Sequence, residues 1–228
     1  KIVDGASYRG GSFFYSRRIG QRTEIDENEI LNDGDQLLSY DETPKLLNSI
    51  KLTGTTNNNL SIGLLNAITD KSFALISDGN NIRKELITPL TNFNVLSLSQ
   101  KILNDYSTIG FINGNLIRES SFEDANNYAF MANIFDNKRN FSFKGYYYKT
   151  YSPRLSQKSG ERKIITIEEL KGNFRYYLNI NATDRYYNQN EIGFYNGRNF
   201  IQYGSRVSYQ ILNKNKYFRS LQSGLYLG

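Results

Sequence analysis

From residue 45 onward the chain alternates between apolar and polar residues, in segments separated by clusters of Asn, Asp, Gly and Ser. The clearest segment covers residues 173–184, where Phe174, Leu178 and Ile180 are apolar and Asn179 and Asn181 fall between them. Successive side chains of a strand point to opposite faces of a sheet, so this alternation predicts strands with one apolar and one polar face. Other segments with the same alternation cover residues 60–69, 93–103, 106–118, 127–135, 140–151, 200–212 and 217–227.

Two architectures accommodate such strands: a soluble sandwich whose apolar faces meet inside, or a membrane barrel whose apolar faces contact lipid. Three features favour the barrel. The segments are about 9–12 residues long, close to the length of a membrane-crossing strand. Short turns, at Asn104-Asp105 and at residues 136–139, alternate with longer polar loops. Tyr residues gather near segment ends, as in the aromatic girdles of barrels.

The pattern therefore predicts an all-β fold, an antiparallel transmembrane β-barrel. We expect about ten strands over residues 45–228, on the segment lengths typical of such barrels. Residues 1–44 lack the alternation and are expected to form an irregular segment ahead of the first strand. Residues 165–174 are open to two interpretations, a single helical turn or the extension of a strand.

Composition narrows the possible chemistry. The 228 residues include 39% hydrophobic and 14% aromatic residues, and no apolar run of about 18 residues marks a transmembrane helix. Cysteine and histidine are absent, so this chain alone supplies no disulfide, no thiolate or imidazole metal ligand and no Ser-His or Cys-His nucleophilic pair. The net charge of +6 is spread along the chain without a Lys/Arg block, which argues against nucleic-acid binding.

The stretch GGSFFYSRRIG places three aromatic rings directly before the paired Arg17 and Arg18. A polar lumen can hold two such charges if carboxylates pair with them. The nearby acidic stretch offers Asp26, Glu27, Asp33 and Asp35 as candidate partners. The segment 1–44 is therefore expected either as a plug inside the lumen, with these ion pairs, or as a solvated segment at the rim of the barrel.

Several weaker sites are weighed against simpler explanations. The acidic stretch 26–35 lacks the ordered spacing of a calcium loop, and we expect no metal and no cofactor. The carboxylates of Glu168-Glu169 and of Glu119, Glu123 and Asp124 are possible acid/base pairs for glycosidic cleavage, although loop carboxylates are common. The Tyr runs at 146–151 and 185–190 suit either interfacial anchoring or sugar stacking.

Several motifs resemble the DUF5916 family. The segment FFYSRRIG (13–20) is followed by SIKLTGTTNNNLSIGLLNAIT (49–69), and the similarity continues through residues 91–118 and 188–204. Here Asn199-Phe200 replaces the Asp-Tyr pair usual in the family. The resemblance implies a Bacteroidetes outer-membrane β-barrel, so the rim beside residues 1–44 would be the periplasmic rim. In the family this barrel is often preceded by a carbohydrate-binding-like domain, which we expect to be absent here. The resemblance also implies a larger barrel, so we expect the barrel to be incomplete in this chain.

The leading hypothesis is a non-enzymatic protein of the outer membrane that acts as a channel, a transport component or a structural partner in a membrane complex. Its expected partners are outer-membrane lipid, lipopolysaccharide and other outer-membrane proteins, without nucleic acid. One alternative is a soluble carbohydrate-binding β-sandwich that uses Tyr146 and Tyr148. Another is an outer-membrane hydrolase that depends on carboxylates.

Overall fold

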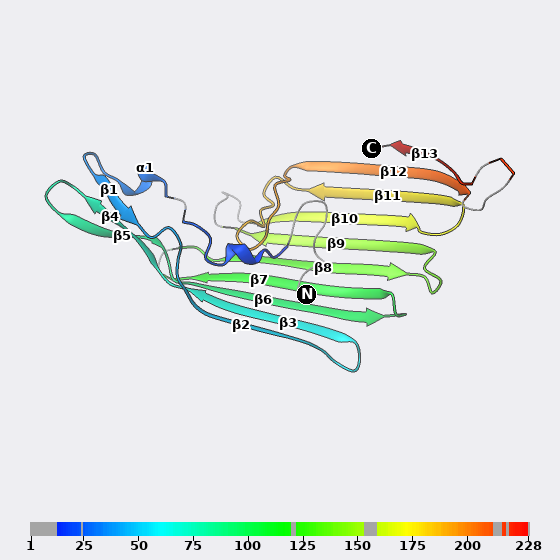
Figure 1. Cartoon of the computed structure of the whole chain (residues 1–228), viewed down its shortest axis with the longest axis horizontal. Helices are drawn as coiled ribbons and strands as arrows, with labels where there is room; N and C mark the ends of the chain where they lie inside the picture. Colours follow the sequence, from blue (N-terminus) through cyan, green and yellow to red (C-terminus); the bar gives the residue numbers. More distant parts are fainter. Residues whose placement is uncertain are drawn as a thin grey trace.

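The structure is a computed structural model and describes residues 13–23, 25–119, 122–152, 159–211, 216–217 and 219–227. Residues 1–12 and Glu24 of the expected irregular segment lie outside the described residues. The described chain is dominated by one antiparallel sheet of ten strands in the order β13-β12-β11-β10-β9-β8-β7-β6-β3-β2 (Figure 1). Nearly every strand pairs with the strand that follows it in sequence, so the sheet is an up-and-down meander.

The alternating segments become strands close to the predicted bounds. The segment predicted at 60–69 is strand β3. Of the segment 165–174, residues 165–169 extend strand β10 in place of a helical turn, and residues 170–173 form the connection to β11. The ten strands of the large sheet are β2 (Leu46–Thr55), β3 (Leu60–Thr69), β6 (Thr91–Ile102), β7 (Ser107–Arg118), β8 (Ala125–Phe135), β9 (Phe141–Tyr151), β10 (Ser159–Glu169), β11 (Phe174–Thr183), β12 (Phe200–Ile211) and β13 (Leu221–Leu227).

The two ends of the large sheet differ in the length of their connections. At one end the strands are joined by short turns, such as residues 56–59, 103–106 and 170–173. Asn59 and Leu103 have φ of 60° and 59°, the left-handed conformation that tight turns require. At the other end the connections are longer, and the longest described ones run from residue 70 to 90 and from 184 to 199.

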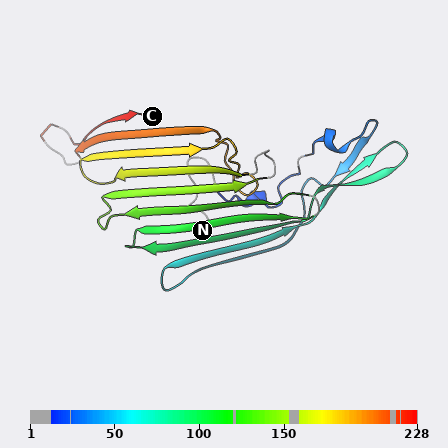
Figure 2. The ribbon, with the colours of Figure 1, turned by 180° about the vertical axis from the view of Figure 1, so that it is seen from behind.

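A second, three-stranded sheet lies beyond the end with long connections (Figures 1 and 2). It consists of β1 (Gln36–Tyr40), β4 (Ser72–Ser77) and β5 (Ile82–Thr88), in the order β1-β4-β5. Strand β1 falls inside the segment 1–44 that the sequence predicted to be irregular. Two short helical turns also form there, η2 (Ser16–Arg18) and α1 (Glu27–Ile30).

The large sheet has one apolar and one polar face, as the alternation predicts. We define the apolar face by Ile165, Ile167, Leu178, Ile180 and the residues in register with them. Leu178 and Ile180 are 48% and 43% exposed, whereas Asn179 and Asn181 on the polar face are 6% and 5% exposed. The burial is therefore the reverse of the usual soluble arrangement, because the apolar side chains lie outside and the asparagines lie inside.

The edges of the large sheet are strands β2 and β13, and every residue of both is exposed. Since β2 and β13 do not pair with each other, the described sheet is open. The all-β antiparallel fold is thus confirmed, whereas closure into a barrel is not observed. No helix among the described residues is long and apolar enough to span a membrane.

Candidate functional site

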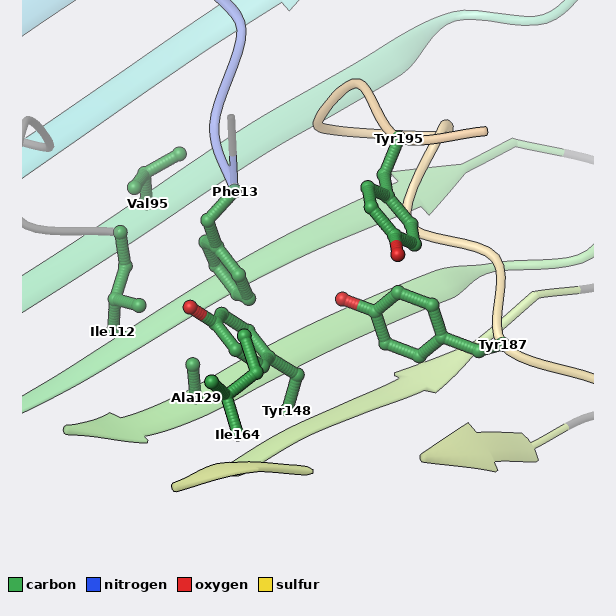
Figure 3. Close-up of a cluster of buried hydrophobic side chains, with 8 residues drawn as sticks. All are labelled: Phe13, Val95, Ile112, Ala129, Tyr148, Ile164, Tyr187 and Tyr195. Atoms are coloured by element: carbon green, nitrogen blue, oxygen red, sulfur yellow. The ribbon is translucent and has the colours of Figure 1, made fainter. Parts of the chain in front are cut away.

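The polar face of the large sheet is covered by two segments that are far apart in sequence. We call residues 13–20 and residues 184–199 the covering segments; the first contains η2, and the second joins β11 to β12. In Figure 3, Phe13 reaches down from the first segment and Tyr187 and Tyr195 reach across from the second, toward Tyr148 on β9. The Phe13 ring centroid lies 6.2 Å from that of Tyr148, and the Tyr187 centroid lies 5.8 Å from that of Tyr195.

This aromatic cluster forms the main core of the described chain. Phe13, with no exposed surface, packs over small and branched side chains that rise from the polar face of β6 to β10. Burial holds the pKa of the Tyr187 phenol well above its ordinary value, so Tyr187 stays neutral. The buried residues of the cluster are Phe13, Val95, Ile112, Ala129, Tyr148, Ile164, Tyr187 and Tyr195.

Two glycines make room for the second covering segment. A Cβ atom on Gly160 of β10 would lie 2.2 Å from the backbone nitrogen of Tyr187. A Cβ atom on Gly114 of β7 would lie 2.9 Å from a methyl carbon of Ile192. Glycine within a strand often marks the close approach of another backbone, and here that backbone is the connection 184–199.

Hydrogen bonds also fix the covering segments to the sheet. The backbone N–H of Asn188 donates to the Thr150 hydroxyl at 3.1 Å, and the Asn127 amide donates to the carbonyl oxygen of Gln189 at 3.1 Å. The first segment rests on the second, because the backbone N–H of Tyr15 donates to the carbonyl oxygen of Ile192 at 2.9 Å. Several buried polar groups of this face thus find partners in the covering segments, whereas Asn127 Oδ1 and Thr183 Oγ1 are buried without a hydrogen-bond partner.

Charged side chains of the sheet also contact the second covering segment. The Arg162 guanidinium of β10 lies 3.9 Å from the ring centroid of Tyr195, and its Nε donates to the Asn181 amide oxygen at 3.3 Å. At the end of β7, an Arg118 nitrogen lies 2.5 Å from a carboxylate oxygen of Glu191. These cations and the covering segment 184–199 were not identified from the sequence. The sequence of residues 184–199 is irregular and polar, and it shows no alternation that would predict a layer over the inner face of the sheet.

The six residues predicted as lumen or plug ion pairs occupy two separate places. Arg17 is exposed and lies 5.9 Å from the Tyr15 ring centroid, whereas Arg18 turns toward the second covering segment. Among the described residues, neither arginine pairs with Asp26, Glu27, Asp33 or Asp35. Asp35 instead forms an ion pair with Arg83 of β5 at 2.7 Å. Asp26 accepts a hydrogen bond from the backbone N–H of Asn28 at the start of α1, and the structure gives Glu27 and Asp33 no role at the cover.

The structure separates the other carboxylates considered for catalysis. Glu168 bonds to Lys144 and to the Ser142 hydroxyl, and Glu169 is its neighbour in the strand, so the two carboxylates point to opposite faces. Glu119 lies 2.8 Å from Lys71, and Asp124 accepts the backbone N–H of Arg118. In the described part of the chain, no three acidic residues gather closely enough to hold a metal ion.

The tyrosines considered for sugar stacking divide between the two faces. Tyr148 is buried beneath the cover, and the Tyr146 hydroxyl donates to the Asn133 amide oxygen at 2.7 Å. Tyr147 and Tyr151 alternate with them and lie on the apolar face. A flat stacking surface of Tyr146 with Tyr148 is therefore not accessible to a sugar.

A cavity of about 580 Å³ opens where the cover, the ends of β3, β6 and β7, and the three-stranded sheet meet. Its wall is mostly polar and includes Arg18, Gln21, Thr88, Arg118, Asn190 and Glu191. Phe93 and Leu116 contribute the buried apolar part of the wall. Among the cavities of the described residues, this one receives polar side chains from both covering segments and from the large sheet, and the others do not.

The fold and the covered face define an all-β protein built on an antiparallel meander with an inner polar layer. The chain belongs to the DUF5916 family, described as a domain of unknown function, whose family model matches residues 7–227. The resemblance inferred from the SRRIG and KLTG motifs is thereby confirmed. No curated protein and no solved structure matches the chain.

Proposed function

We propose that this chain forms the wall and plug of an outer-membrane β-barrel that works as a closed transport component or scaffold without catalysis. The observation that carries the proposal is the reversed burial of the large sheet, with an exposed apolar face and a covered polar face. In water, leaving apolar surface exposed forgoes about 25 cal/mol per Å². An apolar face that extends over many strands therefore needs an apolar environment, and lipid supplies one.

The distribution of side chains on the apolar face supports a membrane. Aromatic rings flank the aliphatic residues on both sides: Phe141 and Phe174 lie next to the short turns, and Tyr128 and Tyr151 lie next to the long connections. Between them come branched aliphatic residues such as Ile165. Membrane barrels place an apolar band between two aromatic girdles in this way.

The connections and the polar face agree with the same proposal. Membrane barrels are meanders with short turns at one end and long loops at the other, as in this sheet. Their lumen is polar, and loops or other segments plug it in many of them. The covering segments would serve as that plug, which favours a closed barrel over an open pore. The exposed edges of β2 and β13 would pair with further strands, because unpaired edges are not tolerated in lipid.

This chain contains no cysteine, so a cysteine introduced into it can be labelled specifically once any cysteine elsewhere in the complete protein is replaced. Leu178→Cys and Asn179→Cys are neighbours on β11 that point to opposite faces. Each variant of the complete protein, in its own membranes, is spin-labelled and its collision rates with oxygen and with a water-soluble nickel complex are measured. We expect the label at 178 to collide mainly with oxygen, as in lipid, and the label at 179 to be shielded from both reagents.

The alternatives give different results. A label at 178 that is shielded from both reagents would indicate a second protein layer on the apolar face, as in a β-sandwich. A label at 178 that collides mainly with the nickel complex, in protein that stays soluble without detergent, would also overturn the membrane proposal. A channel open to ions would instead show steady conductance in planar bilayers and would contradict the closed lumen.

A further inference from the structure

The cavity between the covering segments and the three-stranded sheet contains a positive charge, Arg18, that pairs with no carboxylate of the described chain. Arg18 Nε donates to the carbonyl oxygen of Gly193 at 2.9 Å, and its Nη1 donates to the Gln21 amide oxygen at 2.8 Å. Both acceptors are neutral. Among the described residues, no carboxylate forms an ion pair with Arg18.

The other two arginines of the cavity wall face carboxylates. Arg118 pairs with Glu191, and the exposed Arg22 pairs with Glu42 at 3.2 Å. Arg18 is thus the one guanidinium of the described cavity wall without a described carboxylate at ion-pair distance. An anion at hydrogen-bond distance from a partly buried guanidinium gains more than it would in bulk water, because the local dielectric is lower.

Arg18 is held in place before any ligand arrives. Its backbone N–H donates to the carbonyl oxygen of Tyr15 at 2.9 Å, and Tyr15 is in turn bonded to Ile192. Gly20, with φ of +67°, then turns the chain so that Gln21 lies beside Arg18. A side chain already fixed in its binding geometry loses little conformational entropy when it binds.

The rest of the wall suits a hydroxylated molecule. Gln21 and Asn190 contribute amides, and Thr23 and Thr88 contribute hydroxyls that bond to each other at 3.2 Å. Phe122 contributes an exposed ring, and Glu123 and Glu191 are the carboxylates of the wall. The volume of about 580 Å³ falls within the usual range of roughly 300–1,000 Å³ for small-molecule sites. We propose that this cavity binds a small hydroxylated solute that carries a carboxylate or a phosphate, such as an acidic sugar, and that Arg18 holds its anionic group.

Binding in solution tests this proposal separately from the membrane proposal, because the cavity lies on the polar side of the sheet. The complete purified protein is titrated with glucuronate, glucose 6-phosphate and neutral glucose by calorimetry. We expect both anions to bind more tightly than glucose by about tenfold or more, the effect of one charge-assisted hydrogen bond. Equal affinity for the three probes, or no binding of either anion at millimolar concentration, would overturn the proposal.

Three variants identify the residue. Arg18→Gln should reduce anion affinity to that of glucose, whereas Arg17→Gln, next to it but exposed, should leave it unchanged. Gln21→Glu places a carboxylate beside Arg18 and keeps the contact between the two side chains. It should also abolish the preference for anions. This second variant tests the proposal even if Arg18→Gln fails to fold. If Arg17→Gln weakened binding as much as Arg18→Gln, or if Gln21→Glu still preferred anions, Arg18 would not be the anion-binding group.

Discussion

Arg118, at the end of β7, and Glu191, in the connection between β11 and β12, form an ion pair of 2.5 Å across 73 residues of sequence. The two side chains are only 15% and 6% exposed. The pair fastens the second covering segment to the rim of the sheet, beside the cavity. Both charged groups are largely shielded from water, so removing one of them leaves the other buried and unpaired, which is strongly destabilising.

We expect Glu191→Ala to lower the free energy of unfolding by about 3 kcal/mol, since it leaves a nearly buried arginine unpaired. Removing both partners should cost less than the sum of the single changes, which a double-mutant cycle with Arg118→Ala measures by chemical unfolding. The matched control is Glu42→Ala, which breaks the exposed Arg22–Glu42 pair and should cost less than about 1 kcal/mol. Equal costs for the two ion pairs would contradict the structural role of Glu191.

Gly160 is expected to tolerate no side chain. Gly160→Ala places a Cβ atom 2.2 Å from the Tyr187 backbone nitrogen, so the second covering segment must move away from β10. We expect a loss of about 3 kcal/mol or more, at the upper end for overpacked sites, together with faster proteolysis between residues 184 and 199. Gly54→Ala in β2 serves as control, since nothing lies within 4 Å of its Cβ position. A Gly160→Ala protein as resistant to protease as the control would show that the cover does not depend on this contact.

The three-stranded sheet should weaken in acid. The backbone N–H of Asn32 and then the Arg83 guanidinium hold the pKa of Asp35 below its ordinary value of 3.8. A carboxyl whose pKa is lowered by folding stabilises the fold above its unfolded pKa, and that contribution is lost as the pH falls through the lower, folded value. The protection factors of the amides in β1 and β5, which correct for the intrinsic pH dependence of hydrogen exchange, should therefore fall below about pH 4. In Asp35→Asn this loss of protection should be smaller, with the remainder due to Asp78 in the β4–β5 turn, whose pKa the backbone N–H groups of Asn81 and Asn80 also lower. An unchanged pH dependence would show that Asp35 does not contribute.

A charge on the apolar face should act differently from a charge on the polar face. Leu178→Lys puts an ammonium in the middle of the proposed lipid-facing surface, where we expect a cost of about 2–4 kcal/mol. Gln202→Lys, at an exposed position opposite Asn181 on the neighbouring strand, is the control and should have little effect. The measurements are the yield of folded protein in membranes and its unfolding midpoint in detergent. Similar behaviour of the two variants would contradict a lipid environment for Leu178.

The sequence predicted those parts of the fold in which local pattern and tertiary environment agree. Strands such as β3 and β11 were found because their two faces differ in polarity over their whole length. The first half of β10, residues 159–163, was missed because its sequence SGERK has no apolar residue and therefore no alternation. The three-stranded sheet was missed because its strands are short and two of them belong to one long connection.

The cover itself was harder to predict. The sequence placed Arg17 and Arg18 near the acidic stretch because the two are close along the chain. In space, Asp35 meets Arg83, which lies 48 residues away, and Arg18 meets Gly193, which lies 175 residues away. Contacts of this kind depend on the order and register in which the intervening strands pair, and no local pattern of residues predicts that arrangement.

The dependence of the first covering segment on the second has a consequence for the order of events during biosynthesis. Residues 13–20 leave the ribosome before any strand of the large sheet, yet Tyr15 and Arg18 find their partners at Ile192 and Gly193. The earliest part of the described chain can therefore take its final position only once residues 192 and 193 lie over the sheet. A chain that ended before residue 192 would keep the residues of β6 to β10 beneath Phe13 but would lack these two anchors of the first covering segment.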